Sequence, residues 1–168
     1  MTEFTISELG SLGEFASALA VIASLIYVGI QIKQNTNTSR ISTMQAHVDV
    51  WNDIVGNFCQ SPELASIWRR GITDLSALNE DESVQFFAQT GLITRYYESS
   101  YLEWREGVLD DRLWRGIKQS MLDVMSYSGN QQWWKIRRHW FYAEFREFVD
   151  EIIESGGGQG MYGEGQTS

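Results

Sequence analysis

The side chains that most often carry chemistry are scarce in this sequence. It contains two histidines, His47 and His139, and one cysteine, Cys59. A di-iron helical bundle needs Glu-x-x-His motifs, but Met44 and Ile136 stand three residues before the two histidines. The sequence also lacks an H-E-x-x-H motif, a nucleophile elbow, a P-loop and a dinucleotide-binding fingerprint. It therefore predicts no metal centre and no cofactor, and it favours a protein that is not an enzyme.

Glu98 is the carboxylate of most chemical interest. It follows Tyr97 and stands three residues before Tyr101, so on a helix it could face the buried side. A desolvated glutamate is suited to acid–base catalysis. The alternative is a solvated helix edge at which Arg95 balances the charge. An enzyme that uses Glu98 or His139 for proton transfer is the least favoured of the three functions that we weigh.

The density of aromatic residues provides a second function, the binding of a small molecule or lipid. Tyr and Trp side chains combine a flat apolar ring with a polar atom, which suits them to line a pocket for a flat or apolar ligand. The candidate ligand-binding residues are Tyr97, Glu98, Tyr101, Trp104, Trp133, Trp134 and Arg137. The alternative is that the aromatic residues are helix core and that Arg137 pairs with Glu144 or Glu147.

The stretch from Phe15 to Ile32, FASALAVIASLIYVGIQI, has no charged residue. Eighteen residues of helix rise about 27 Å, close to the roughly 30 Å of a bilayer's hydrocarbon core. We therefore expect this stretch to contact membrane lipid as a transmembrane helix. The alternative is a fully buried helix of a soluble, cytoplasmic bundle, which the polar residues Ser17 and Ser24 favour.

The charges around this stretch indicate an orientation. Glu14 precedes it, whereas Lys33 and Arg40 follow it, so the positive-inside rule places the carboxyl side in the cytoplasm. We therefore expect the chain to cross the membrane once. A secretory signal peptide is disfavoured because its leading region should be basic, and no Lys or Arg precedes Lys33.

Small residues recur every four positions in the same stretch, at Ala16, Ala20 and Ser24. Such spacing lets two transmembrane helices approach closely. The favoured function is thus a membrane-anchored interaction or scaffold module, and its partner is a second copy of the chain or another membrane protein.

The rest of the chain predicts helices only, because no segment alternates with period two between turn signals. A stripe at Ile41, Met44, Val48, Trp51, Val55 and Phe58 indicates a one-sided helix. Residues 35–39 either continue the first helix or form a hinge. The predicted fold is all-α, with an amino-terminal hydrophobic helix and then a bundle of about five helices.

Start and stop signals divide the bundle. Ser61-Pro62-Glu63 and Asn79 with Glu82 predict helix starts, and Asp110 predicts a third. Gly71 and Gly107 are the expected ends of the first two helices. Asn130 is expected to begin a short helix that contains Trp133 and Trp134, and a final helix carries Phe141, Phe145, Phe148 and Ile152.

Composition sets the domain organisation and excludes one class of partner. We expect a membrane anchor at residues 1–33, a helical domain at 34–154 and a flexible glycine-rich tail at 155–168. The formal charge of −9 argues against a nucleic acid as partner, because binding needs clustered cations to neutralise phosphates.

Four stretches together carry a likeness to known sequences: IYVGIQIKQNT, SPELASIWRRG, YLEWREGVLDDRLW and the spaced pattern WW..RR..F...F. With these stretches the chain resembles a group of small uncharacterised bacterial proteins, from Leu12 to Ile153. The resemblance implies an all-helical, membrane-associated bacterial protein, so the expected location is the bacterial inner membrane. It assigns no activity and no site residue.

Overall fold

The computed structural model describes residues 6–160, and for residues 6–9, 11, 12 and 37 it describes the backbone only. All regular structure within this range is helical, as the sequence predicts. The chain forms two units, residues 1–42 and 43–168. Helix α1 (Ile6–Gln60) begins in the first unit and ends in the second.

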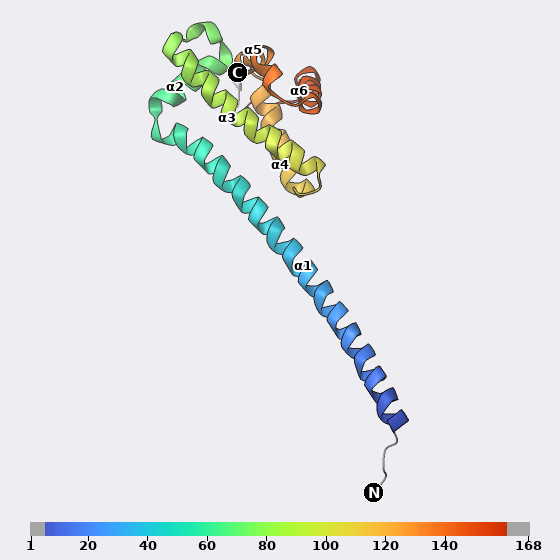
Figure 1. The fold of residues 1–168 in the computed structure, drawn as a ribbon. Helices are drawn as coiled ribbons and strands as arrows, with labels where there is room; N and C mark the ends of the chain where they lie inside the picture. The colour runs from blue at the N-terminus through green and yellow to red at the C-terminus, as the bar shows by residue number, and fades with distance from the viewer. Residues whose placement is uncertain (1–5, 161–168) are drawn as a thin grey trace. The chain divides into compact units, whose positions relative to one another are not determined.

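Residues 35–39 continue α1 rather than forming a hinge (Figure 1). The hydroxyl of Thr36 donates to the carbonyl of Ile32 at 2.9 Å, and that of Thr38 donates to Gln34 at 3.0 Å. These bonds to the preceding turn satisfy the polar side chains within the helix, so the polar patch does not interrupt it.

Within the described residues, the second unit contains five further α-helices, the number that the sequence predicts (Figure 1). They are α2 (Pro62–Thr73), α3 (Glu80–Arg105), α4 (Asp111–Met125), α5 (Ser128–Arg137) and α6 (Ala143–Ser155), with two short 3₁₀ turns at Leu75–Ala77 and Arg138–Trp140. Helix α3 packs against α2, α4 and α5, and α6 packs against α4. We call this unit the helical domain.

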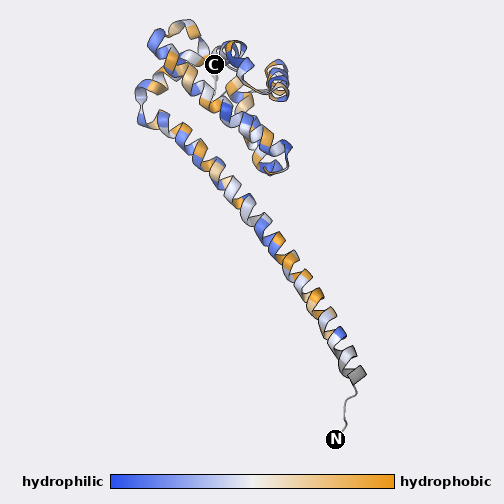
Figure 2. Cartoon of the chain, viewed as in Figure 1, coloured by the Kyte–Doolittle hydropathy of each residue, from blue (hydrophilic) through white to orange (hydrophobic). Residues whose placement is uncertain are grey.

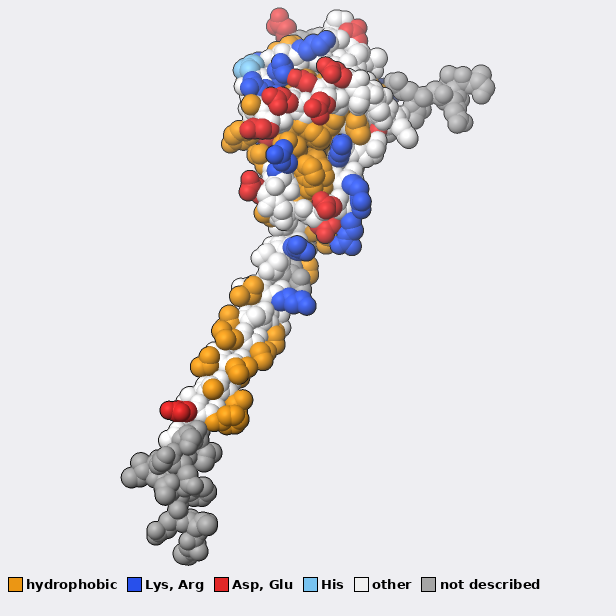
Figure 3. Space-filling view, turned by 90° about the vertical axis from the view of Figure 1, so that its right-hand side faces the viewer, with side chains coloured by type: hydrophobic (Ala, Val, Ile, Leu, Met, Phe, Trp, Pro, Cys, Tyr) orange, Lys and Arg blue, Asp and Glu red, His pale blue; other side chains and the backbone are white. Residues whose placement is uncertain are grey.

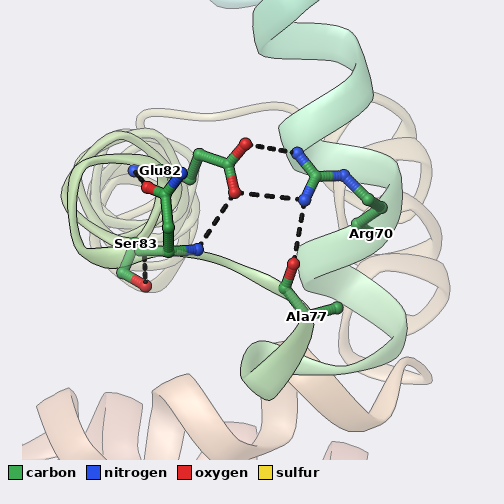
Figure 4. A network of polar contacts seen from close by, with 5 residues as sticks. Arg70, Ala77, Glu82 and Ser83 are labelled. Atoms are coloured by element: carbon green, nitrogen blue, oxygen red, sulfur yellow. Dashed lines mark hydrogen bonds and ion pairs between the residues drawn. The ribbon is translucent and has the colours of Figure 1, made fainter.

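The predicted helix starts of α2 and α3 are confirmed. Ser61 accepts a hydrogen bond from the amide of Leu64, and Asn79 and Glu82 form a complete capping box. Glu82 also binds Arg70 of α2 through both carboxylate oxygens, and Arg70 donates to the carbonyl of Ala77 (Figure 4). The cap therefore fixes the end of α2 against the start of α3.

Gly71 and Asn130 do not have the roles that the sequence suggests. Helix α2 continues past Gly71 to Thr73, and α5 begins at Ser128, two residues before Asn130. Both residues serve contacts between helices. A Cβ on Gly71 would lie 2.4 Å from the Phe86 ring, and the Asn130 amide donates to the carbonyl of Val124 at 2.7 Å.

The buried face of α1 within the helical domain differs from the predicted stripe. His47 and Ile54 are buried and Trp51 and Phe58 are half-buried, but Val48 is exposed. Met44 and Val55, with Ile41 in the first unit, are exposed as well. The predicted stripe is therefore only partly correct, because the domain covers the neighbouring line of residues.

Residues 157–159 of the glycine-rich tail, which follow α6, contact α4. The amide of Gln159 donates to Asp123 at 2.9 Å, and a Cβ on Gly158 would lie 2.3 Å from the carbonyl oxygen of Leu122. Gly156 has φ +61°, the left-handed conformation with which helices often end. Residues 161–168 of the expected tail lie outside the described residues.

Candidate functional site

A groove lies on the helical domain where the last turns of α1 meet α3 and α4. Its volume is about 250 Å³. Helix α1 lines it with His47, Val48 and Trp51, and α3 contributes Tyr96. Helix α4 supplies the remaining wall through Leu113, Gly116, Ile117 and Ser120. The groove is therefore mostly apolar, and His47, Tyr96 and Ser120 contribute polar atoms to its lining.

Two aromatic rings from different helices form one wall of the groove. The ring centroids of Trp51 and Tyr96 lie 5.5 Å apart and their planes are tilted by 38°. The His47 ring meets the edge of Tyr96 at 5.6 Å. Contacts of this geometry are favourable between aromatic rings, so the wall has a defined shape.

His47 has fixed partners on both sides of its ring. Its Nε2 lies 2.8 Å from Oε2 of Glu103, and its Nδ1 lies 3.4 Å from the hydroxyl of Ser100. Because a carboxylate only accepts, Nε2 carries the proton. His47 is 7% exposed, so these contacts position a nearly buried ring and hold α1 against α3.

Ser100, His47 and Glu103 have the order of groups found in a catalytic triad, but the geometry does not fit a nucleophile. Ser100 has no exposed surface, and its hydroxyl donates to the carbonyl of Tyr96 at 2.8 Å. A nucleophilic oxygen has to reach a substrate. The network is thus a structural anchor for the groove.

Sequence reasoning did not find this network. His47 and Glu103 are 56 residues apart, and in the sequence Glu103 has the pattern of a solvated helix edge. One signal was available: Tyr96, Ser100 and Glu103 are spaced by four and three residues, which places them on one face of a helix.

Among the predicted ligand-binding residues, Tyr97, Trp133 and Trp134 are almost fully buried. Trp133 and Trp134 both contact the ring of Phe141, at 6.2 and 5.3 Å between centroids. The indole N–H of Trp134 donates to Asp150 at 2.8 Å. These two tryptophans form part of the domain core.

Tyr97 of α3 does not line the groove but contacts two residues that do, Trp51 and Ser120. Its hydroxyl lies 2.9 Å from that of Ser120, a residue that lines the groove. Burial raises the pKa of the Tyr97 phenol well above its ordinary value, and the Ser120 contact opposes this only in part. Tyr97 is therefore a neutral hydrogen-bonding group behind the groove wall.

Tyr101 and Trp104 belong to a second aromatic group, towards the carboxyl end of α3. Tyr101 stacks on Phe148 at 4.8 Å, and Trp104 stacks on Trp114 at 5.1 Å with planes only 15° apart. The Trp104 indole N–H donates to Asp111 at 2.9 Å. The structure thus does not bring all the predicted residues together around one space.

Arg137 lies over two aromatic rings. Its guanidinium carbon is 4.6 Å from the centroid of Trp140 and 5.3 Å from that of Phe87. This cation–π arrangement differs from the pairing with Glu144 or Glu147 that the sequence offers as an alternative.

Glu98 is buried, with 2% of its surface exposed, and it is not at a solvated helix edge. One carboxylate oxygen accepts the backbone N–H of Tyr142 at 2.9 Å, just before α6 begins, and the other pairs with Arg95. A carboxylate is stabilising at this positive end of a helix. One oxygen thus binds the start of α6, and the other is paired within α3.

Replacing Glu98 should reveal this structural role. We expect Glu98→Ala to lower the free energy of unfolding by about 2–3 kcal/mol, because the backbone N–H of Tyr142 loses a charged partner. Glu98→Gln keeps an acceptor and should lower it by about 1 kcal/mol. Urea titration followed by tryptophan fluorescence measures both values. An unchanged midpoint for Glu98→Ala would contradict this role.

No group of three or more His, Cys, Asp or Glu side chains that could hold a metal ion lies among residues 6–160. Cys59 is exposed near the end of α1, and His139 is exposed beside Trp140.

Comparison with known protein families, with curated proteins and with solved structures finds no match.

Proposed function

We propose that this chain is a single-pass membrane protein whose helical domain acts through contacts with a second copy or with another membrane protein. The observation that carries the proposal is the exposure of the apolar stretch in α1. Every residue of that helix from 13 to 36 is exposed, with Phe15 at 65% and Leu25 at 67%.

The length and composition of this stretch support the membrane assignment. An 18-residue window in α1 has a mean hydropathy of 2.1, and none of it is buried (Figure 2). Figure 3 shows hydrophobic side chains along the surface of the same segment. The core helix of a soluble bundle is covered by its own chain, whereas lipid tails cover a transmembrane helix.

Exposed apolar surface on the helical domain supports the interaction role. Met44, Val48 and Val55 are exposed on α1 at spacings that suit helix–helix packing. On the face of the domain shown in Figure 3, hydrophobic side chains gather between charged ones. Apolar patches rimmed by polar groups are typical of protein interaction surfaces.

Alkaline carbonate extraction of membranes tests the anchor. The treatment strips peripheral proteins but leaves transmembrane helices in the bilayer, so we expect the full-length chain in the pellet. A soluble bacterial protein and a known integral protein serve as the two controls. Release of the chain into the supernatant would refute an integral anchor.

The orientation has its own test, because the sequence contains a single cysteine and Cys59 is exposed. Lys33 and Arg40 follow the apolar stretch and favour a cytoplasmic carboxyl side. A membrane-impermeant maleimide should therefore label Cys59 only after spheroplasts are lysed. A Cys59→Ser chain gives the background. Equal labelling of Cys59 in intact and in lysed spheroplasts would indicate the opposite orientation.

A further inference from the structure

The groove beside Trp51 contains space that no part of the described chain fills. Gly116 lies within α4, where glycine is the least favourable residue apart from proline. A Cβ on Gly116 would meet no atom within 4 Å. By contrast, Cβ atoms on Gly71, Gly91 and Gly129 of α2, α3 and α5 would each contact a neighbouring helix.

We propose that this groove binds a small, uncharged aromatic molecule that carries one hydrogen-bonding group. The absence of a side chain at position 116 leaves the α4 side of the groove open to an occupant. The proposal concerns the helical domain alone and does not depend on the membrane anchor.

The size of the groove favours a small molecule over a partner helix. Its volume of about 250 Å³ is just below the range of roughly 300–1,000 Å³ that is usual for ligand pockets. An α-helix with its side chains is about 10–12 Å wide and would need a longer trough. An aromatic molecule with one or two rings suits this volume.

The lining determines the chemistry of that molecule. Among the described residues, no Lys, Arg, Asp or Glu lines the groove, so a charged ligand would lose its hydration without gaining a partner. Trp51 and Tyr96 offer aromatic rings, and Ile117 offers an apolar contact from α4. The Tyr96 and Ser120 hydroxyls can each accept or donate one hydrogen bond to the ligand.

The His47 network keeps the groove in shape before a ligand arrives. Glu103 and Ser100 hold the His47 ring from two sides, and the side-chain amide of Gln89 donates to the carbonyl of Ile54 at 3.4 Å. Both contacts tie α1 to α3. A wall that is fixed in advance loses less conformational entropy when a ligand binds.

Fluorine NMR with 5-fluoroindole as the probe tests the proposal on the full-length chain in detergent micelles. We expect saturable binding that exceeds partition of the probe into empty micelles. Gly116→Leu should weaken binding at least tenfold because its side chain occupies the groove. Arg115→Leu changes an exposed neighbour on α4 that does not line the groove and should bind as the wild type does.

A second blocking variant at another position makes the test independent of Gly116→Leu. Val48 lies on the α1 wall and is half exposed, so Val48→Phe should fill the groove from α1 and also weaken binding at least tenfold. If Gly116→Leu disturbs the fold, the result with Val48→Phe decides. Absence of saturable binding, or equal affinity in the wild type and a folded blocking variant, would overturn the proposal.

Discussion

Replacing two residues in the middle of the apolar stretch with lysine should release this protein from membranes. Ile22 and Ile26 are exposed one turn apart on α1, near the centre of the uncharged run. Placing Lys at the centre of a membrane helix costs about 2.5–3.5 kcal/mol per residue on insertion scales. The double variant Ile22→Lys with Ile26→Lys therefore loses roughly 5–7 kcal/mol of insertion free energy.

Flotation in a density gradient measures the effect. Wild-type chain should rise with the lipid, and the double variant should stay in the dense fractions. The matched control is Ile41→Lys with Met44→Lys, which changes two exposed apolar residues of the same helix beyond the uncharged stretch. This control should float as the wild type does. Equal flotation of all three chains would mean that the stretch does not hold the protein in the bilayer.

The second large effect is expected at Gly129, where helices α2 and α5 are in backbone contact. A Cβ on Gly129 would lie 1.8 Å from the carbonyl oxygen of Gly71, and backbone cannot move aside as a flexible side chain can. Overpacking a core costs about 1–3 kcal/mol and occasionally more. We expect Gly129→Ala to lower the free energy of unfolding by about 3 kcal/mol.

The matched control should change the free energy of unfolding in the opposite direction. Gly116 is also a helical glycine, but a Cβ there meets nothing within 4 Å. Gly116→Ala should raise the free energy of unfolding by about 0.5–1 kcal/mol, because alanine is the better helix former. Urea midpoints of the two variants, followed by tryptophan fluorescence, should therefore move in opposite directions. A shift of both midpoints in the same direction would contradict the close contact.

The contrast between these glycines shows which features a sequence can predict. Asn79 with Glu82 and Gly107 were predictable because a cap and a left-handed stop depend on residues close by in the chain. Gly71 has the same local appearance as a stop signal. Its role is set by Phe86, and no local pattern reveals which ring a glycine will face.

In the candidate site, too, the sequence predicts what depends on nearby residues and not what depends on distant ones. Helical spacing correctly predicted that Tyr97 and Tyr101 lie on a buried face of α3. It could not predict that a groove would form at Trp51, beside Tyr97, because that depends on how α1 meets α4. The burial of Glu98 is also non-local, since the group that it binds is the backbone N–H of Tyr142, 44 residues later.

We propose that lipid, and not protein, covers the apolar stretch of α1. The most direct measurement is the behaviour of the full-length wild-type chain in cells lysed without detergent. We expect the chain to sediment with the membranes and to enter solution only when detergent is added. A compact 19.3 kDa monomer in detergent-free buffer, seen by analytical ultracentrifugation, would show that lipid does not cover this stretch.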